Sequence, residues 1–131
     1  MFKQSFFEQL KELASIQGTP GQEMLVVKRL VEWFSPHADR VEVDHMGNLY
    51  AYLEGDKPGP TVMVSAHSDE IGCVVRDIDE RGFIRIERTG GMIEALMVGR
   101  KVNVNGHFGV IGVKAGHLQT PEERKKTPSI Y

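Results

Sequence analysis

Residues 61–70 read TVMVSAHSDE, and the interpretation of the whole sequence depends on this stretch. Its first six residues are nearly all apolar or small, and they do not alternate with polar residues. A strand of this kind is typically buried on both faces, as in the centre of an α/β sheet. His67, Asp69 and Glu70 follow at the predicted end of the strand, where the functional groups of α/β proteins gather.

Two helices are predicted before this strand. Gly18 is expected to end the first helix, and the run Thr19-Pro20-Gly21-Gln22 is expected to begin the second through a capping threonine and a proline at the first helical position. Ser35-Pro36 ends the second helix, because the residue before a proline avoids the helical region. Each helix is predicted from an apolar stripe at helical spacing: Phe6, Leu10, Leu13 and Ala14 in the first, and Met24, Val27, Leu30, Val31 and Phe34 in the second.

The remaining pattern divides the chain near residue 70. Short strands within 40–53 turn at Met46-Gly47-Asn48, and together with the helices and the buried strand they predict a three-layer α/β domain over residues 1–70. After residue 70 the short strands, frequent glycines and the Asn105-Gly106 turn predict a small antiparallel β-barrel or sandwich over residues 71–131. The tail is expected to be a loop or a short helix that begins near Thr120.

Composition excludes several classes of function. The 131 residues carry a net charge of −2, which gives no electrostatic footprint for nucleic acid or for an anionic membrane. Cys73 is the only cysteine, so no internal disulfide forms, and we interpret it as a small buried hydrophobe. The amphipathic, charged N-terminus lacks the apolar run of a signal peptide or membrane span. We therefore expect a cytoplasmic protein.

The chemistry of the sequence centres on His67 and Asp69. Residues two apart in an extended segment point the same way, so the Asp69 carboxylate can orient the His67 imidazole. A carboxylate that fixes the tautomer of a ligand histidine recurs in metal sites. The alternative is a polar surface turn, and the short spacing does not decide between the two. The other histidines are interpreted as solvated or structural residues: His37, His45, His107 and His117.

A set of segments in a fixed order resembles the glutamyl aminopeptidase family, cytosolic peptidases with two metal ions that include the tetrahedral and deblocking aminopeptidases. The resemblance is to the N-terminal part of the family and covers essentially the whole sequence. Ser68, where the family frequently has methionine, is a mild departure. The matching segments are Gly18 to Glu23, Asp44 to Leu49, Ala66 to Gly72, Gly82 to Arg85, Gly90 to Met92, Gly99 to Val102 and Gly109 to Gly112.

The resemblance implies an activity and a site. It implies a metal-dependent aminopeptidase that acts on peptides, with two divalent metal ions, zinc or cobalt. His67 matches a metal ligand, Asp69 matches the catalytic-site carboxylate that orients it, and Glu70 matches no ligand. The domain after residue 70 matches an inserted β-domain through which such enzymes form homo-oligomers.

The remaining ligands and the general base of the family match no position in these 131 residues. A zinc site needs at least three protein ligands. We therefore expect a fragment that is inactive alone. The alternative is a truncated, non-catalytic assembly or regulatory module of the same family. A third hypothesis, a glucanase, requires a pair of carboxylates that the sequence does not single out.

Overall fold

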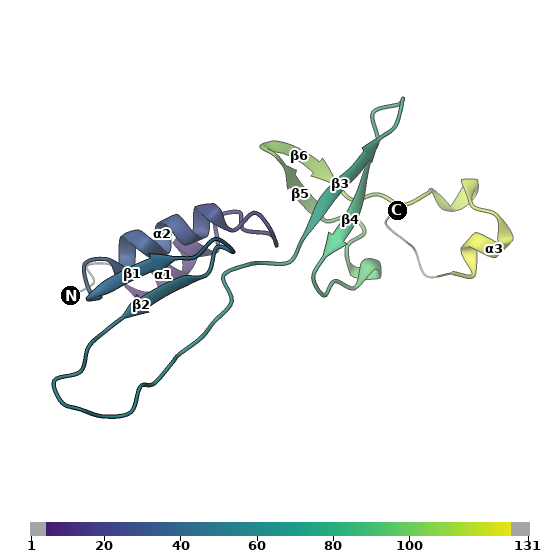
Figure 1. The fold of residues 1–131 in the computed structure, drawn as a ribbon. Helices are drawn as coiled ribbons and strands as arrows, with labels where there is room; N and C mark the ends of the chain where they lie inside the picture. The colour runs from purple at the N-terminus through teal and green to yellow at the C-terminus, as the bar shows by residue number, and fades with distance from the viewer. Residues whose placement is uncertain (1–4, 127–131) are drawn as a thin grey trace. The chain divides into compact units, whose positions relative to one another are not determined.

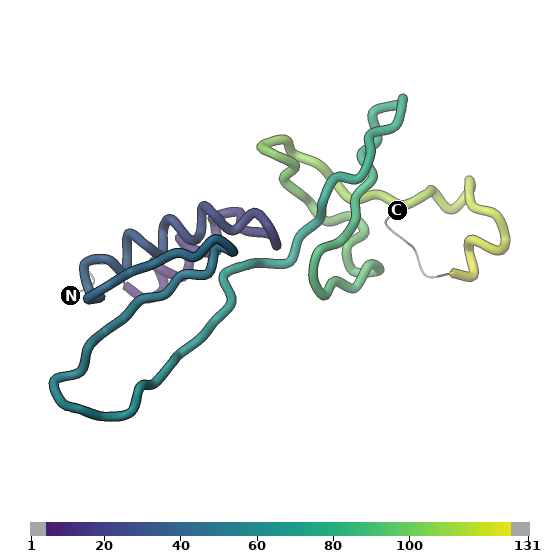
Figure 2. Tube along the Cα trace, in the orientation of Figure 1, coloured from purple at the N-terminus to yellow at the C-terminus, as the bar shows by residue number. Residues whose placement is uncertain are grey.

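Helices come first in the chain and paired strands follow (Figures 1 and 2). The computed structural model describes residues 5–126. The chain divides between Glu70 and Ile71 into two units, called here the N-terminal unit and the β unit. No helix among the described residues is long and apolar enough to cross a membrane.

The helix α1 spans Phe6–Leu13 and begins with a capping box, in which the Ser5 hydroxyl accepts from the Glu8 N–H and the Glu8 carboxylate accepts from the Ser5 N–H. It ends at Leu13, so the prediction that it runs to Gly18 is wrong. The residues after Leu13 form tighter turns, in which Ile16 donates to the Leu13 carbonyl at 3.1 Å. Such i to i+3 bonds commonly close a helix end.

The helix α2 spans Met24–Phe34 and begins later than the sequence predicts. Gln22 donates to the Thr19 carbonyl at 2.8 Å, and Gly21 has a φ of +84°. These residues form a turn instead of a first helical turn, because a right-handed helix needs negative φ at every residue. The predicted capping by Thr19 is therefore wrong. The end of α2 before Pro36 is confirmed.

Strands β1 (Arg40–Val43) and β2 (Leu49–Tyr52) form an antiparallel hairpin, and α2 packs against β2 (Figure 1). The most buried side chains of this unit are Val26 and Val27 of α2, at 6% and 3% exposure. The N-terminal unit is thus a small mixed α/β structure with its core beneath one face of the hairpin.

The segment 61–66 is the main departure from the predicted fold. It forms no strand, and its Val62 and Val64 side chains are 81% and 92% exposed. The prediction of a buried central strand is therefore wrong for this structure. The physical reason is that none of its backbone groups finds a strand partner among the described residues, which contain only three two-stranded sheets.

The β unit contains two antiparallel hairpins, and the predicted small antiparallel barrel or sandwich is not confirmed. β3 (Gly72–Ile78) pairs with β4 (Ile84–Thr89), and β5 (Lys101–Val104) pairs with β6 (His107–Val110). Asn105 and Gly106, with φ of 49° and 89°, make the predicted turn between β5 and β6. The other elements are the 3₁₀ helices η1 (Glu94–Leu96) and η2 (Gly116–Leu118) and the short helix α3 (Pro121–Arg124), and the buried side chains are Met92 and Ile111.

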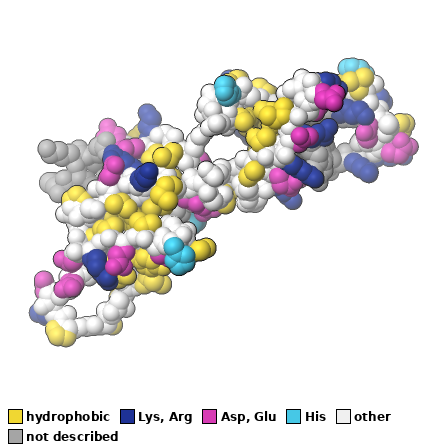
Figure 3. Space-filling model, turned by 45° about the horizontal axis from the view of Figure 1, so that its top comes forward, with side chains coloured by type: hydrophobic (Ala, Val, Ile, Leu, Met, Phe, Trp, Pro, Cys, Tyr) yellow, Lys and Arg dark blue, Asp and Glu magenta, His cyan; other side chains and the backbone are white. Residues whose placement is uncertain are grey.

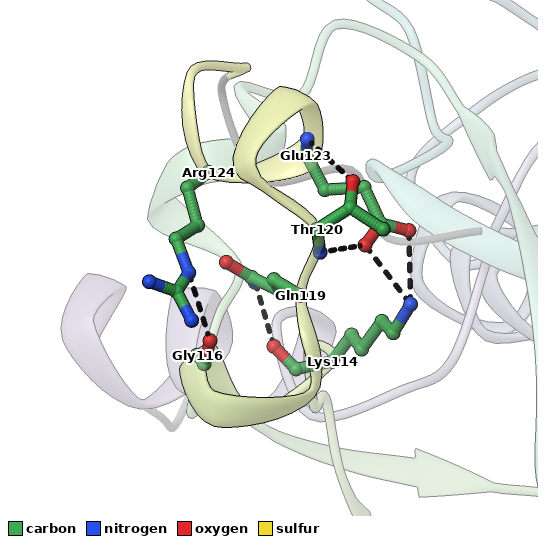
Figure 4. Close-up of polar contacts among 6 residues, drawn as sticks. All are labelled: Lys114, Gly116, Gln119, Thr120, Glu123 and Arg124. Carbon is green, nitrogen blue, oxygen red and sulfur yellow. Dashed lines mark hydrogen bonds and ion pairs between the residues drawn. The ribbon is translucent and has the colours of Figure 1, made fainter.

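Polar contacts hold α3 to the preceding loop (Figure 4). Thr120 and Glu123 form a capping box, and Lys114 Nζ lies 2.9 Å from Glu123 Oε2. The Thr120 N–H and the Lys114 ammonium hold the pKa of Glu123 below its ordinary value. Arg124 Nε donates to the Gly116 carbonyl at 3.1 Å. Of the two alternatives that the sequence left open for this tail, the short helix is the one that forms, with Thr120 as its N-cap.

Candidate functional site

His67 and Asp69 lie together where the extended segment ends. His67 Nδ1 is 3.1 Å from Asp69 Oδ1 and 3.0 Å from the Asp69 carbonyl oxygen. A carbonyl and an ionised carboxylate can only accept hydrogen bonds, so in this geometry Nδ1 donates and carries the proton. A neutral imidazole then presents the lone pair of Nε2 outward, which is the form that binds a metal ion.

The two side chains differ in their contact with solvent. The His67 side chain is 86% exposed, whereas that of Asp69 is 37% exposed. The imidazole is therefore hydrogen-bonded to Asp69 through Nδ1, and its other nitrogen, Nε2, has no such contact among the described residues and is free to bind a ligand. This arrangement suits a ligand that is oriented by a neighbouring carboxylate and shared with groups from elsewhere.

A pair of hydrogen bonds fixes the chain directly after Asp69. The Glu70 N–H donates to the Gly18 carbonyl at 2.8 Å, and the Gly18 N–H donates to Glu70 Oε1 at 3.4 Å. We call this pair the Gly18–Glu70 clasp. A Cβ on Gly18 would lie 2.6 Å from Val26 Cγ2. Only glycine therefore allows the chain at position 18 to pack this closely against α2.

Sequence reasoning missed the clasp. It assigned Gly18 to the end of a helix and found no role for Glu70. No local signal could have found it, because the partners are 52 positions apart in the chain. Its effect is to tie the end of the extended segment to the loop between α1 and α2, one residue from the carboxylate that meets His67.

An apolar cavity of about 780 Å³ lies beside this site in the N-terminal unit. Residues of α1, α2, β2 and the extended segment line it, and its polar end is formed by residues 67–70. Hydrophobic side chains are visible on the surface of both parts of the chain (Figure 3). The apolar lining includes Leu10, Leu13, Val27, Leu30, Phe34, Leu49, Ala51, Leu53, Val62 and Val64.

The residues present do not fit a complete metal centre. Within residues 5–126, no group of three or more His, Cys, Asp or Glu side chains is placed to hold a metal ion. His67 and Asp69 therefore stand as a partial site, below the three protein ligands that zinc requires. His45 and His107 are exposed, in a turn and at the start of β6. Burial raises the pKa of the Cys73 thiol, so this residue is not an activated nucleophile.

The chain belongs to the M42 glutamyl aminopeptidase family, whose model matches residues 47–131. This family consists of metallo-aminopeptidases and implies metal cofactors. The predicted resemblance to the family is thereby confirmed.

The relatives are much longer than this chain. The lysyl aminopeptidase of Pyrococcus furiosus is 33% identical over 86% of the chain, which covers 34% of the relative. The solved structure of the TET aminopeptidase from a marine sediment Thaumarchaeota archaeon is similar with a TM-score of 0.80 and 30% identity, over 92% of the chain and 34% of that structure. The TET1 peptidase of Pyrococcus horikoshii, described as able to assemble into a tetrahedron or a large octahedral shell, matches with a TM-score of 0.74 and 30% identity, over 97% of the chain and 38% of its own length. The chain thus spans about a third of the length of these relatives.

Proposed function

We propose that this chain forms the N-terminal part of a metal-dependent aminopeptidase that removes N-terminal residues from peptides. The observation that carries the proposal is the His67–Asp69 pair, in which the carboxylate holds the proton on Nδ1 and leaves Nε2 open. Family membership supports the same activity. In this proposal residues 1–70 belong to a three-layer α/β catalytic domain and residues 71–131 to an inserted β-domain.

The proposal gives each of the two residues a distinct role. His67 is one ligand of a site for two divalent ions, zinc or cobalt, and Asp69 orients its imidazole. The other ligands and the general base come from polypeptide outside these 131 residues, because the described residues do not supply them. The chain therefore contributes one metal ligand and the carboxylate that orients it, and it is inactive by itself.

The proposed surroundings of the enzyme follow from its relatives. The Pyrococcus horikoshii peptidase is described as a large assembly, and we extend homo-oligomer formation through the β-domain to this chain. Its net charge of −2 supports neither nucleic-acid nor membrane partners. A cytoplasmic location and peptide substrates complete the proposal.

A chimera tests the activity. The chain replaces the matching third of the Pyrococcus furiosus lysyl aminopeptidase, and hydrolysis of aminoacyl-anilides is measured with cobalt or zinc. We expect His67→Ala to abolish hydrolysis and Asp69→Asn to lower metal affinity or activity about 10- to 100-fold, since it loses an orienting partner. His45→Ala is the matched control, because this exposed histidine lies outside the site, and it should retain activity.

Cobalt binding, followed by absorbance, separates a structural failure from a failure of the proposal. A chimera that unfolds cooperatively but neither binds cobalt nor hydrolyses any anilide contradicts it. Full activity in the His67→Ala variant would show that the ligand is assigned to the wrong residue.

A second candidate function is a non-catalytic assembly or regulatory module. The exposed aromatic side chains of the β unit favour it, since Phe83 and Phe108 are 65% and 71% exposed. This candidate predicts that the chain forms a defined oligomer without metal. Sedimentation of the purified chain with and without cobalt tests it, and a monomer under both conditions argues against it.

A further inference from the structure

The turn between β5 and β6 carries the only Asn-Gly pair of the sequence, Asn105-Gly106. Both residues are exposed, and they alone separate the two strands, since Val104 pairs with His107. Their φ values of 49° and 89° both lie in the left-handed region, as in a two-residue type I′ turn. The turn thus presents to solvent an asparagine side-chain amide that is followed by a residue without a side chain.

An asparagine that precedes glycine can close a ring on its own backbone. The Gly106 amide nitrogen, once it has lost its proton, attacks Cγ of Asn105, the N–C bond forms and ammonia leaves, which gives a succinimide. Water then opens the ring at either carbonyl, so the product is aspartate or isoaspartate, whose main chain runs through the side-chain carboxyl. Glycine favours the attack because it has no side chain in the way. The conversion consumes one water, releases one ammonia and needs no other reactant.

The structure holds the nucleophile of this reaction in a hydrogen bond. The Gly106 N–H donates to Asn103 Oδ1 at 2.7 Å. Asn103 lies in β5 opposite Phe108, so its side chain stays beside the turn as long as the two strands are paired. Attack on Asn105 requires the Gly106 N–H to leave this acceptor and lose its proton. The hydrogen bond therefore opposes ring closure while the hairpin is formed.

We propose that Asn105 is a site of spontaneous conversion to isoaspartate and that Asn103 controls the rate by holding the Gly106 N–H. Conversion is slow while β5 and β6 are paired and fast once the hairpin opens. Asn103 is thus a protecting residue, and the state of the hairpin sets how long the turn keeps its chemical identity. The inference goes beyond the proposed peptidase activity and does not depend on it.

Conversion at this turn affects a buried side chain of the β unit. The β5–β6 ladder continues beyond the strand ends, because the Ile111 N–H donates to the Arg100 carbonyl at 2.9 Å and the Gly99 N–H donates to the Ile111 carbonyl at 2.8 Å. Ile111 is 6% exposed. Isoaspartate adds one carbon to the main chain of a two-residue turn, and the length of the turn sets the register of the strands. We therefore expect the converted chain to lose the pairing that buries Ile111.

Peptide mapping of the aged chain tests the proposal. The purified chain is incubated at neutral and mildly alkaline pH, in buffer and in concentrated urea. Isoaspartate is then measured by mass spectrometry and by methylation with a protein isoaspartyl methyltransferase. The two other asparagines, Asn48 and Asn103, are internal controls, because leucine and valine follow them and hinder the attack. We expect conversion at Asn105 alone, rising with pH and faster in urea than in buffer.

A matched pair of variants at position 103 isolates the hydrogen bond. Asn103→Ala removes the acceptor, and conversion at Asn105 in buffer should quicken about 2- to 10-fold, the factor that corresponds to one ordinary hydrogen bond. Asn103→Asp keeps an acceptor oxygen, and its charge opposes deprotonation of the Gly106 N–H, so its rate should not exceed that of the unchanged chain. In urea the alanine variant and the unchanged chain should convert at the same rate. Amide exchange at Ile111 reports whether the hairpin is formed in each variant.

Three outcomes overturn the inference. The first is no more isoaspartate at Asn105 than at Asn48, in urea as well as in buffer. The second is a rate in buffer that equals the rate in urea, or equal rates in buffer for the unchanged chain and both variants. The third is a quickening in Asn103→Ala that an equal loss of protection at Ile111 accompanies, which assigns the control to hairpin opening and not to the Gly106 hydrogen bond. No metal or peptide substrate enters these measurements, so they are separate from the test of the proposed function.

Discussion

The segment 61–66 and the strand β3 both contain short apolar stretches, yet only β3 is paired. β3 meets β4 through a turn of four residues, Asp79 to Gly82, whereas the segment 61–66 has no partner among the described residues. Pairing through a short turn needs little chain entropy, and pairing across a long separation needs a partner brought from far away. The comparison teaches that turn chemistry, more than apolar content, decides which runs of this chain become strands.

The turn after β3 shows what the segment 61–66 lacks. The Asp79 carboxylate accepts from the N–H groups of Arg81 and Phe83, both at 3.0 Å, and Gly82 has a φ of +84°. The β1–β2 hairpin repeats the device with Asp44 and Gly47 in the same positions. An aspartate followed three residues later by glycine therefore closes a hairpin in each unit.

The largest effect is expected at the clasp that holds the segment 61–66. Gly18→Ala would place a methyl group 2.6 Å from Val26 Cγ2. Val26 is a buried, β-branched residue of α2 and has little freedom to move away. We expect a loss of about 1–3 kcal/mol in the free energy of unfolding of the N-terminal unit, measured by amide exchange in α2.

Gly55→Ala serves as the control for this change. A Cβ at Gly55 meets only ordinary van der Waals contact, at 3.7 Å from the Lys57 carbonyl oxygen. This variant should be neutral or slightly stabilising, because it lowers the entropy of the unfolded chain. Equal effects of the two substitutions would mean that the clasp does not position the segment.

A smaller effect is expected in the turn of the β3–β4 hairpin. Gly82→Ala forces an L-residue into the left-handed region, at a cost of about 1–2 kcal/mol, although nothing lies within 4 Å of the added methyl group. Gly91→Ala is the control, since its site is equally open and its φ is not positive. Amide exchange across β3 and β4 should quicken only in the Gly82 variant. If exchange in β3 and β4 is unchanged in the Gly82→Ala variant, the Asp79–Gly82 turn is not the reason why β3 is paired.

A pH-dependent effect is expected from Asp79. Hydrogen bonds from the Phe83 N–H, and then from Arg81, hold the pKa of Asp79 below its usual value of 3.8. A carboxyl whose pKa is depressed by folding stabilises the folded form above the unfolded pKa, and this contribution is lost as pH falls through the folded pKa. The protection of the β3 and β4 amides, measured relative to the exchange rate of the unfolded chain at the same pH, should therefore fall only below about pH 3.8. Asp79→Asn keeps an acceptor oxygen without a titrating proton and should remove this part of the pH dependence.

The sequence predicted the local elements well. The β1–β2 and β5–β6 hairpins and the end of α2 follow from turn and helix-ending residues that act within a few positions. The short helix at Thr120 is one of the two alternatives that the sequence left open. The start of α2 was wrong because a proline followed by glycine also closes a turn, and the positive φ of Gly21 decides between these possibilities. The sequence pattern does not predict whether these residues form a turn or the first turn of the helix.

The long-range features could not be predicted. The clasp between Gly18 and Glu70 joins residues 52 positions apart, and Val64 is exposed because the segment 61–66 has no strand partner among the described residues. The spacing of His67 and Asp69 allowed a contact without deciding it against a polar surface turn, and in the structure the two side chains meet at 3.1 Å. Their roles as metal ligand and orienting carboxylate remain predictions, since the described residues do not complete a metal site.

The smallest expected effect tests the comparison most directly. Val75→Thr replaces a methyl group by a hydroxyl opposite Ile86 in the β3–β4 hairpin and should cost about 0.2–1 kcal/mol, the usual range for a cross-strand pair. Val64→Thr makes the same replacement in a side chain that is 92% exposed, and it should leave the stability of the chain alone unchanged within about 0.5 kcal/mol. Equal losses of stability in the two variants would contradict the comparison, because Val64 would then contribute to packing as much as the paired Val75 does.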